Sequence, residues 1–295
     1  MRLLAVVIAL FGIGISVSAP ARSQVTSNVL RRVLEIRVGG GDGIQGSAFT
    51  FDVDGREYLV TAKHMVAHLK DKDKIEIAVR TNQWDSIDVA VYRCDGQVDV
   101  AVLVPSRQLT VNFPLDPTDG LGHDVSDGQD MYFVGFPFGQ SAWAVTAYSH
   151  RMNGDYPIPL VKKAVFSGSF EREHEPPVIL LDGFNAHGFS GGPIVYRDLN
   201  APNAWTFRVM GVISGFEPDL VHPVKDDALR NGEDISKIEG WRLPPFAPIP
   251  PGHILRDTEQ LVPLNSGIVV GYSISFAVDL INKHPEGPKT KSDFQ

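Results

Sequence analysis

Short apolar segments separated by turn-forming residues recur along most of this 295-residue chain, and they constrain its fold more than any other feature. Six such segments of β-strand length lie in the first hundred-odd residues: Val33–Val38, Ser47–Val53, Tyr58–Ala62, Ile75–Val79, Ile87–Tyr92 and Val98–Val104. Clusters of Gly, Asp and Asn separate them, as at residues 39–42 and 52–55. The pattern predicts antiparallel strands joined by short turns.

A second set of strand-like segments begins after residues 105–129, a stretch rich in Pro, Asp and Gly that we interpret as a linker. Its members share the same apolar runs and occur at residues 131–134, 144–148, 161–166, 178–181, 194–196, 207–213 and 268–274. Helical periodicity is found near the end, at residues 276–282. We therefore predict an all-β fold of two packed six-stranded antiparallel β-barrels with a short C-terminal helix.

The proline-rich residues 217–265 depart from this pattern, because strand signals are few there. Ordered loops of such length are uncommon in compact domains, and most of them serve a function or are disordered. We interpret residues 217–265 as a large insertion between the last two strands of the second barrel.

The chain begins with a short positive segment followed by an apolar one. Arg2 precedes an uncharged run over residues 3–19, and small residues follow up to Ala21. This is the pattern of a secretory signal peptide cleaved after Ala21. An uncleaved membrane anchor is the alternative, because a run of about 17 apolar residues is at the lower limit for spanning a bilayer. The sequence thus predicts an exported protein, periplasmic or secreted, without stable membrane insertion after cleavage.

The charge balance argues against a nucleic-acid-binding protein, and the single cysteine excludes a protein stabilised by internal disulfides. Acidic residues outnumber basic ones by 35 to 27, so the net charge is −8, or −9 once Arg2 is removed with the signal segment. An acidic protein without a basic run is not expected to bind nucleic acid. Cys94 is the only cysteine, so the chain cannot form an internal disulfide, and its apolar surroundings favour a structural thiol over a reactive one.

Residues 188–193, Gly-Phe-Ser-Gly-Gly-Pro, contain the candidate nucleophile Ser190. Glycines on both sides allow a tight turn in which backbone N–H groups point into a common site. Such a turn would place the N–H groups of Gly188 and Ser190 around a substrate carbonyl, where they could stabilise an oxyanion. A simple glycine-serine turn is the alternative for this segment taken alone.

A base and a carboxylate that could activate this serine occur earlier in the chain. His64 ends an apolar strand at a predicted turn, which would present its ring to a cleft, whereas His68 lies beyond the strand. Asp99 lies within the apolar segment 98–103, where burying an acid is costly unless it has a partner. A structural histidine and a surface acid on an edge strand, as at Asp88, are the alternatives for each residue alone.

The order His64, Asp99, Ser190 is that of chymotrypsin-type peptidases. Segments 61–64, 99–103 and 188–193 resemble the three active-site motifs of trypsin-like serine peptidases. Four further segments resemble those of the bacterial HtrA/Deg branch, namely residues 46–49, 135–139, 165–168 and 271–274. The resemblance covers roughly residues 43–283 and is to the protease domain, without the PDZ domain that HtrA proteins carry.

This resemblance implies a division of the chain and roles for further residues. The expected parts are a signal peptide (1–21), a barrel with His64 and Asp99 (28–122), a barrel with Ser190 and the insertion (123–284), and a polar tail (285–295). Ser214 would hydrogen-bond Asp99, and its strand would pair with the substrate backbone by β-augmentation.

The expected substrate-binding residues are Phe184, Ser214, Gly215 and Phe216. Phe184 stands where trypsins have an acid, so a preference for Lys or Arg before the cleaved bond has no electrostatic basis. We expect small or medium apolar residues there instead.

The resemblance implies a serine endopeptidase from a bacterial source that hydrolyses protein or peptide substrates without a metal or cofactor. A catalytically weak or inactive protease-fold module with a binding or chaperone role in the cell envelope is the alternative. Phe189 and His187, which flank the oxyanion glycine, and the insertion support that alternative, since any of them could leave the oxyanion loop collapsed. Phe189 also replaces the aspartate that trypsins pair with a freed N-terminus, so activation of that kind is not expected. An esterase or transferase with the same three residues is a third possibility; no oligomeric state is predicted.

Overall fold

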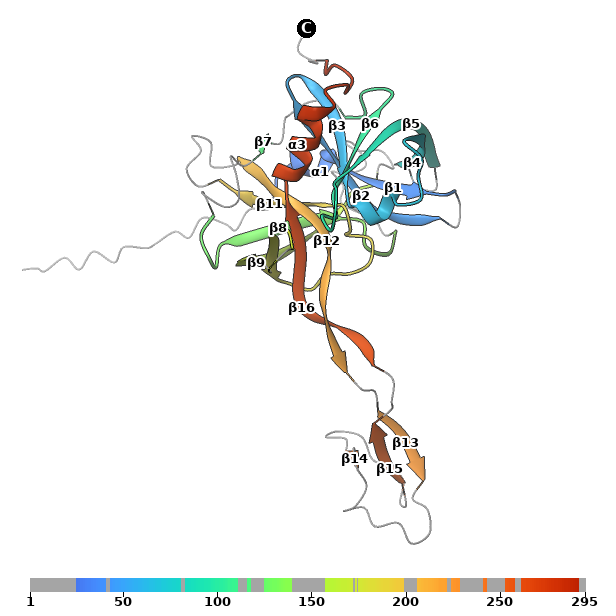
Figure 1. Ribbon diagram of the computed structural model, residues 1–295, viewed down its shortest axis with the longest axis vertical. Helices are drawn as coiled ribbons and strands as arrows, with labels where there is room; N and C mark the ends of the chain where they lie inside the picture. Colours follow the sequence, from blue (N-terminus) through green and yellow to red (C-terminus); the bar gives the residue numbers. More distant parts are fainter. Residues whose placement is uncertain are drawn as a thin grey trace, which may run out of the picture.

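Two closed six-stranded antiparallel β-barrels form the body of the protein in the computed structural model (Figure 1). The structure describes residues 25–40, 43–80, 83–110, 116–117, 125–139, 157–171, 173, 175–198, 206–221, 224–228, 241–242, 253–257 and 261–291. The predicted all-β fold of two six-stranded barrels is therefore confirmed. The predicted signal segment 1–21 and the predicted strand at 144–148 lie outside the described residues.

The first barrel closes in the order β1-β2-β3-β6-β5-β4, with β1 pairing both β2 and β4. Its strands are β1 (Val33–Val38), β2 (Ile44–Val53), β3 (Arg56–Thr61), β4 (Lys72–Arg80), β5 (Gln83–Arg93) and β6 (Ala101–Pro105). A short 3₁₀-helix, η1 (Lys63–Val66), follows β3 directly. Its interior is filled by branched aliphatic side chains such as Ile36, Leu59 and Leu103, all fully buried.

The second barrel closes in the order β11-β8-β9-β10-β16-β12, with β11 and β12 completing the ring. Its strands are β8 (Asp130–Gly135), β9 (Leu160–Phe170), β10 (Val178–Asp182), β11 (Pro193–Arg197), β12 (Phe207–Val221) and β16 (Val262–Ser273). The 3₁₀ turn η2 (Pro137–Gly139) follows β8. Within the predicted linker, the two-residue strand β7 (Asp116–Pro117) pairs in parallel with β12.

Two helices cover the contact between the barrels. They are α1 (Ser27–Arg32), which the sequence pattern did not predict, and α3 (Ser275–Lys283), which matches the predicted C-terminal helix. One apolar cluster joins Val29 of α1 and Ile281 of α3 to Phe51 of the first barrel and Val134 of the second. The barrels thus share a core rather than meeting through a polar surface. None of the described helices is long and apolar enough to cross a membrane.

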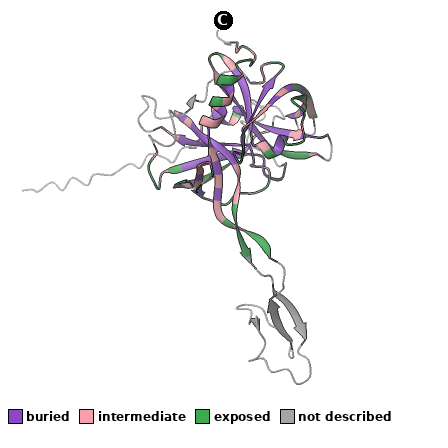
Figure 2. Cartoon of the chain, in the orientation of Figure 1, coloured by how far each residue is buried: buried purple, intermediate pink, exposed green. Residues whose placement is uncertain are grey.

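Strands occupy part of residues 217–265, although strand signals are few there in the sequence. β12 and β16 stay paired well beyond the barrel, as far as Val221 opposite Val262. The resulting ribbon leaves the body of the molecule and is largely exposed (Figures 1 and 2). Between them, β13 (Val224–Ala228), β15 (His253–Asp257) and β14 (Trp241–Arg242) form a three-stranded sheet.

Prolines did not prevent these strands from forming, because of where they lie in the register. Pro218 lies opposite Asn265, and Pro263 lies opposite Leu220. Proline is tolerated in a strand when its nitrogen faces away from the partner, since no ladder hydrogen bond is then lost.

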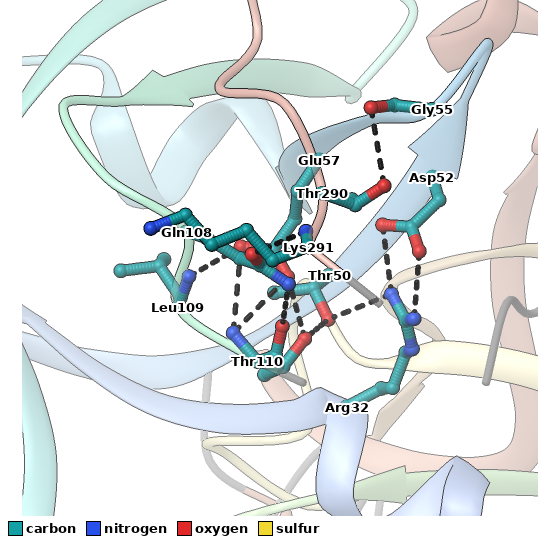
Figure 3. A network of polar contacts seen from close by, with 10 residues as sticks. All are labelled: Arg32, Thr50, Asp52, Gly55, Glu57, Gln108, Leu109, Thr110, Thr290 and Lys291. Atoms are coloured by element: carbon teal, nitrogen blue, oxygen red, sulfur yellow. Dashed lines mark hydrogen bonds and ion pairs between the residues drawn. The ribbon is translucent and has the colours of Figure 1, made fainter. Parts of the chain in front are cut away.

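A polar cluster fastens the first barrel to the segments around it (Figure 3). We call Arg32, Thr50, Asp52, Glu57 and Thr110 the Glu57 cluster. The Glu57 carboxylate accepts hydrogen bonds from Thr110 N–H (3.0 Å) and Thr110 O–H (2.6 Å). Thr110 in turn contacts Thr50 (2.6 Å), and Arg32 forms a two-point ion pair with Asp52 (2.7 and 2.9 Å). The cluster joins α1, β2, β3 and the segment after β6.

The polar tail also returns to the first barrel. The Glu57 N–H donates to Pro288 O (2.9 Å), and Thr290 N–H donates to Gly55 O (2.9 Å). The chain therefore ends its described part on the barrel where it began.

Cys94 lies half-buried against the shared core. Burial raises the pKa of its thiol to about 11. A thiol with that pKa is protonated at neutral pH and is a poor nucleophile. This agrees with the structural role expected from the sequence.

Candidate active site

Strand pairing in the first barrel brings His64 and Asp99 together. Thr61, the last residue of β3, lies opposite Ala101, the first residue of β6. His64 follows β3 on η1 and Asp99 precedes β6, so both residues lie at the same rim of the barrel. The His64 ring contacts Asp99 through Nδ1 and Oδ2 at 2.7 Å, and the His64 backbone N–H donates to Asp99 Oδ1 at 2.8 Å.

The Asp99 carboxylate is held by three hydrogen bonds. Besides the two from His64, the Ser214 hydroxyl donates to Asp99 Oδ2 at 2.6 Å, as the resemblance implied. Burial alone would raise the pKa of Asp99, but the hydrogen bonds from His64 and Ser214 and the nearby His64 ring together hold it below its ordinary value. An ionised Asp99 accepts only, so Nδ1 of His64 carries a proton, and Nε2 is the ring nitrogen available to act as the base. The His64 side chain is 48% exposed, which leaves Nε2 accessible.

Ser190 belongs to the second barrel and is connected to the His64–Asp99 pair through Ser214. Its hydroxyl donates to Ser214 O at 3.1 Å. Ser214 thus contacts Asp99 with its hydroxyl and Ser190 with its carbonyl. Within the described residues, Ser190 makes no hydrogen bond to the His64 ring. Contacts of this kind are often long or misaligned in the absence of substrate and tighten when it binds.

Residues 186–192, which we call the Ser190 loop, take a shape that requires glycine. Gly188 has φ +99°, and a Cβ there would lie 2.3 Å from Phe136 O. Gly191 has φ +82°, and a Cβ there would lie 2.2 Å from Ser47 O. No L side chain fits either position. These are two of the glycines on which the sequence-based prediction of a tight turn depended.

Phe189 anchors the same loop in the core of the second barrel. Its side chain is fully buried and meets the Phe133 ring edge to face, with centroids 4.9 Å apart. Such a pair stabilises the loop beyond its apolar burial by about 1 kcal/mol. A buried aromatic ring therefore occupies the position where trypsins use a charged pair. His187, by contrast, is exposed and lies beside the Phe138 ring.

Hydrogen bonds hold every carbonyl of residues 187–190. His187 O accepts from Phe138 N–H (2.8 Å), Gly188 O from the Ser47 hydroxyl (2.6 Å), Phe189 O from Gly192 N–H (2.9 Å) and Ser190 O from Ser47 N–H (3.0 Å). In a trans peptide the N–H points opposite to the C=O, so each held carbonyl also orients the next N–H. Among the described residues, the N–H groups of Gly188 and Ser190 have no partner. These are the two donors that the sequence predicted for the oxyanion.

The residues expected around the substrate differ in their surroundings. The ring of Phe184 is 62% exposed, and Lys162 Nζ lies 5.4 Å from its centroid. Gly215 and Phe216 lie on β12 next to Ser214 and are partly exposed. On this side of β12, pairing with β11 ends at Val212, and no described strand follows it further.

Asn185 and Ser47 are two residues of this region that sequence reasoning missed. The buried Asn185 side chain donates from Nδ2 to Gly215 O at 2.8 Å and joins the segment before the Ser190 loop to β12. Asn265, at the base of the ribbon, donates to Asn185 O at 2.6 Å. The buried Ser47 hydroxyl contacts the Ser190 loop directly. The signal in the sequence that could have identified Ser47 was the position of a polar residue inside an apolar strand.

The comparisons with known proteins agree with this geometry. Residues 46–200, just over half of the chain, match the family model of the trypsin-like peptidase domain. A comparison with curated proteins gives no match. The active form of the Rv3671c protease from M. tuberculosis superposes with a TM-score of 0.50 at 14% identity, covering 90% of this chain and 85% of that one.

An HtrA-type protease gives a similar result. A variant of AlgW with a tripeptide superposes with a TM-score of 0.50 at 16% identity, and the match covers 87% of this chain but 61% of the AlgW chain. At such identities the likeness concerns the fold. The family model, the paired barrels and the neighbours together show that this chain belongs to the trypsin-like peptidase family.

Proposed function

We propose that this protein is an exported serine endopeptidase that cleaves peptide bonds in protein or peptide substrates. Ser190 is the nucleophile, His64 the general base and Asp99 the carboxylate that orients it. The N–H groups of Gly188 and Ser190 stabilise the oxyanion. The observation that carries the proposal is that the N–H groups of Gly188 and Ser190 have no partner among the described residues, whereas the carbonyls of residues 187–190 are all hydrogen-bonded.

Attack begins with a rotation of the Ser190 side chain from Ser214 O toward His64 Nε2, a change between staggered rotamers. His64 takes the hydroxyl proton as Ser190 Oγ bonds to the substrate carbonyl carbon. Asp99, kept ionised, stabilises the imidazolium that forms and does not itself take the proton. His64 then protonates the leaving amine, and water repeats the sequence to release the acid product.

The charge that develops on the substrate oxygen meets donors that are already in place. The carbonyls of residues 187–190 are all engaged, so the loop need not reorganise as the tetrahedral intermediate forms. Preorganised donors of this kind contribute about 100- to 1000-fold in rate each.

The substrate backbone would lie along the open edge of β12, from Ser214 to Phe216. No described strand pairs with this edge beyond Val212, so an extended peptide could add to it as a strand. Asn185 donates a hydrogen bond to Gly215 O on this strand, and we expect the residue before the cleaved bond to enter beside it. That bond, with Phe216 beside it, supports a preference for small or medium apolar residues. Export to the periplasm or the medium remains part of the proposal and rests on residues 1–21.

The test is labelling of the purified mature protein with a fluorophosphonate, together with hydrolysis of a peptide library. We expect labelling of wild type and loss of labelling in Ser190→Ala and His64→Ala. The library should be cleaved after small or medium apolar residues. A folded wild type that is neither labelled nor active would contradict the proposal and favour a binding module, and hydrolysis of esters but not of amides would favour an esterase.

A further inference from the structure

We propose that the Ser47 hydroxyl is a positioning group that holds the Ser190 loop in its catalytic shape; this inference rests on the proposed function. Ser47 lies on β2 of the first barrel, whereas the Ser190 loop belongs to the second. Its side chain is fully buried. The residue therefore connects the barrel that carries His64 with the loop that carries Ser190.

Two hydrogen bonds fix the direction of the Ser47 hydroxyl. Phe136 N–H donates to Ser47 Oγ at 2.9 Å, and Ser47 Oγ donates to Gly188 O at 2.6 Å. A hydroxyl carries one proton, so the bond to Gly188 O uses the only donor that Ser47 Oγ has. The backbone N–H of Ser47 donates to Ser190 O at 3.0 Å. One residue of the first barrel thus holds two peptides of the loop.

The peptide between Gly188 and Phe189 lies between the two open N–H groups, so its orientation affects both. Without the Ser47 hydroxyl, one described hydrogen bond to this peptide remains, from Phe189 N–H to Ala186 O at 3.3 Å. Gly188 has no side chain to restrain its backbone. The His187–Gly188 peptide, which carries the Gly188 N–H, is itself held by Phe138 N–H through His187 O at 2.8 Å. We therefore expect that loss of the hydroxyl frees the Gly188–Phe189 peptide to turn, and that this motion shifts the aim of the Gly188 N–H through the unrestrained Gly188 backbone.

The surroundings of Ser47 leave no simple replacement for its hydroxyl. A Cβ on the facing Gly135 would lie 2.5 Å from Ser47 Oγ and 2.9 Å from the Phe189 ring. Ser47 Oγ and the Phe189 ring thus pack directly against the Gly135 backbone. In Ser47→Ala, both Gly188 O and Phe136 N–H would lose a partner.

A positioning role predicts an effect on the transition state rather than on substrate binding. A donor aimed at the oxyanion acts on charge that exists only after attack has begun. Ser47→Ala should therefore lower kcat and the affinity for a peptide boronic acid, which forms a tetrahedral adduct. It should leave KM and the affinity for the corresponding peptide amide nearly unchanged.

The experiment compares Ser47→Ala with Thr50→Val in the full mature chain. Thr50 is also fully buried on β2, but its hydroxyl contacts Thr110 and Arg32 and does not reach the Ser190 loop. For Ser47→Ala we expect kcat and boronic acid affinity to fall by about 10- to 100-fold, with KM within about twofold. For Thr50→Val we expect a comparable loss of thermal stability and kcat within about twofold.

Two outcomes would overturn the inference for an active wild type. One is a folded Ser47→Ala protein with unchanged kcat and boronic acid affinity. The other is an equal fall of kcat in both variants in step with their stability, which would make Ser47 a purely structural residue. If Ser47→Ala does not fold, Ser47→Cys, a weak donor of similar shape, should show an intermediate kcat, and a wild-type kcat in that variant would overturn the inference. A wild type without activity would instead overturn the proposed function and this inference together.

Discussion

The Glu57 cluster and the Ser190 loop are both buried polar regions, but they differ in how completely their groups are paired. In the Glu57 cluster, the carboxylate and hydroxyl oxygens meet donors from the same cluster or its neighbours (Figure 3). Its one buried atom without a partner among the described residues is Arg32 Nε. In the Ser190 loop, all carbonyls of residues 187–190 are held, yet the N–H groups of His187, Gly188 and Ser190 have no partner among the described residues.

The difference separates a region that stabilises the fold from one that is ready to bind. Buried polar groups are normally paired, since an unpaired one costs about 1–3 kcal/mol. Random disorder of a loop would leave carbonyls and N–H groups unpaired alike. Within residues 187–190 only donors are open: two belong to Gly188 and Ser190 at the nucleophile, and the third to the exposed His187. That selectivity is what an oxyanion, as the missing acceptor, would require.

The largest expected effect is a fall in kcat on replacement of Asp99, which orients His64 in the proposed mechanism. Asp99→Asn would present an amide to His64 Nδ1 and favour the tautomer that lacks a free Nε2 base. The equivalent substitution in a chymotrypsin-type triad leaves the geometry intact but lowers kcat about 10⁴-fold, and we expect a fall of that order here. Stopped-flow hydrolysis of a peptide ester measures this, and circular dichroism checks that the variant is folded.

The same substitution also tests the role of ionised Asp99 in stability. Its folded pKa is lowered, so its contribution is present above the unfolded value of about 3.9 and is lost as pH falls through the folded pKa. Wild type should therefore lose more stability on acidification below about pH 4 than Asp99→Asn. In the activity measurement, a kcat of Asp99→Asn within tenfold of wild type would show that Asp99 does not orient His64.

The sequence predicted both barrels and the three catalytic candidates because each depends on local patterns. Apolar alternation and turn residues define the strands, and His64, Asp99 and Ser190 lie next to them. The extent of β12 was not predictable in this way. Whether Pro218 breaks a strand depends on which way its nitrogen faces, and that is set by the register with β16.

Contacts between the barrels were equally beyond local patterns. Ser47 and Gly188 are far apart in the chain, and nothing near Ser47 indicates that its hydroxyl reaches the Ser190 loop. Phe189 looked like a departure that could collapse this loop, but it is buried against Phe133 and anchors it. The sequence shows which residues are unusual, whereas the packing decides whether they disturb or stabilise.

The next largest effect should be a loss of stability when the Glu57 carboxylate is removed from the Glu57 cluster. Glu57→Ala removes the acceptor of the Leu109 and Thr110 N–H groups and of the Thr110 hydroxyl. We expect the free energy of unfolding to fall by about 3 kcal/mol, because several buried donors lose their partner. Urea denaturation measures the loss. Where the variant is folded, kcat should stay within about twofold, and a larger fall would mean that the two regions are coupled.

Glu35 of β1 provides a third case, a buried carboxyl without a hydrogen-bond partner in the described part of the chain. Burial raises its pKa from 4.5 to about 7, although the nearby Arg37 opposes the shift. The folded state thus binds this proton more tightly than the unfolded state. Stability from this group is fully present below about pH 4.5 and is lost as pH rises to about 7.

Glu35→Gln should remove this pH dependence. The change corresponds to at most about 3 kcal/mol, so the variant should be more stable than wild type at pH 8 and similar to it at pH 4. Urea denaturation at a series of pH values gives the difference between the two proteins directly. A constant difference across the series would show that Glu35 has a normal pKa and a partner after all.

The smallest expected effect is a change in substrate preference on replacement of Asn185, which lies next to the Ser190 loop. Asn185 joins the segment before the Ser190 loop to Gly215 and is buried, and in the proposed mechanism the substrate residue before the cleaved bond would enter beside it. In Asn185→Gly the space for this substrate residue should widen, and the kcat/KM ratio of a Leu substrate to an Ala substrate should rise about tenfold. Asn265→Ala is the matched control, since it removes the bond to Asn185 O without widening the space. A rise in both variants would assign the effect to movement of the segment and not to the Asn185 side chain, and the pocket would then depend on the base of the ribbon.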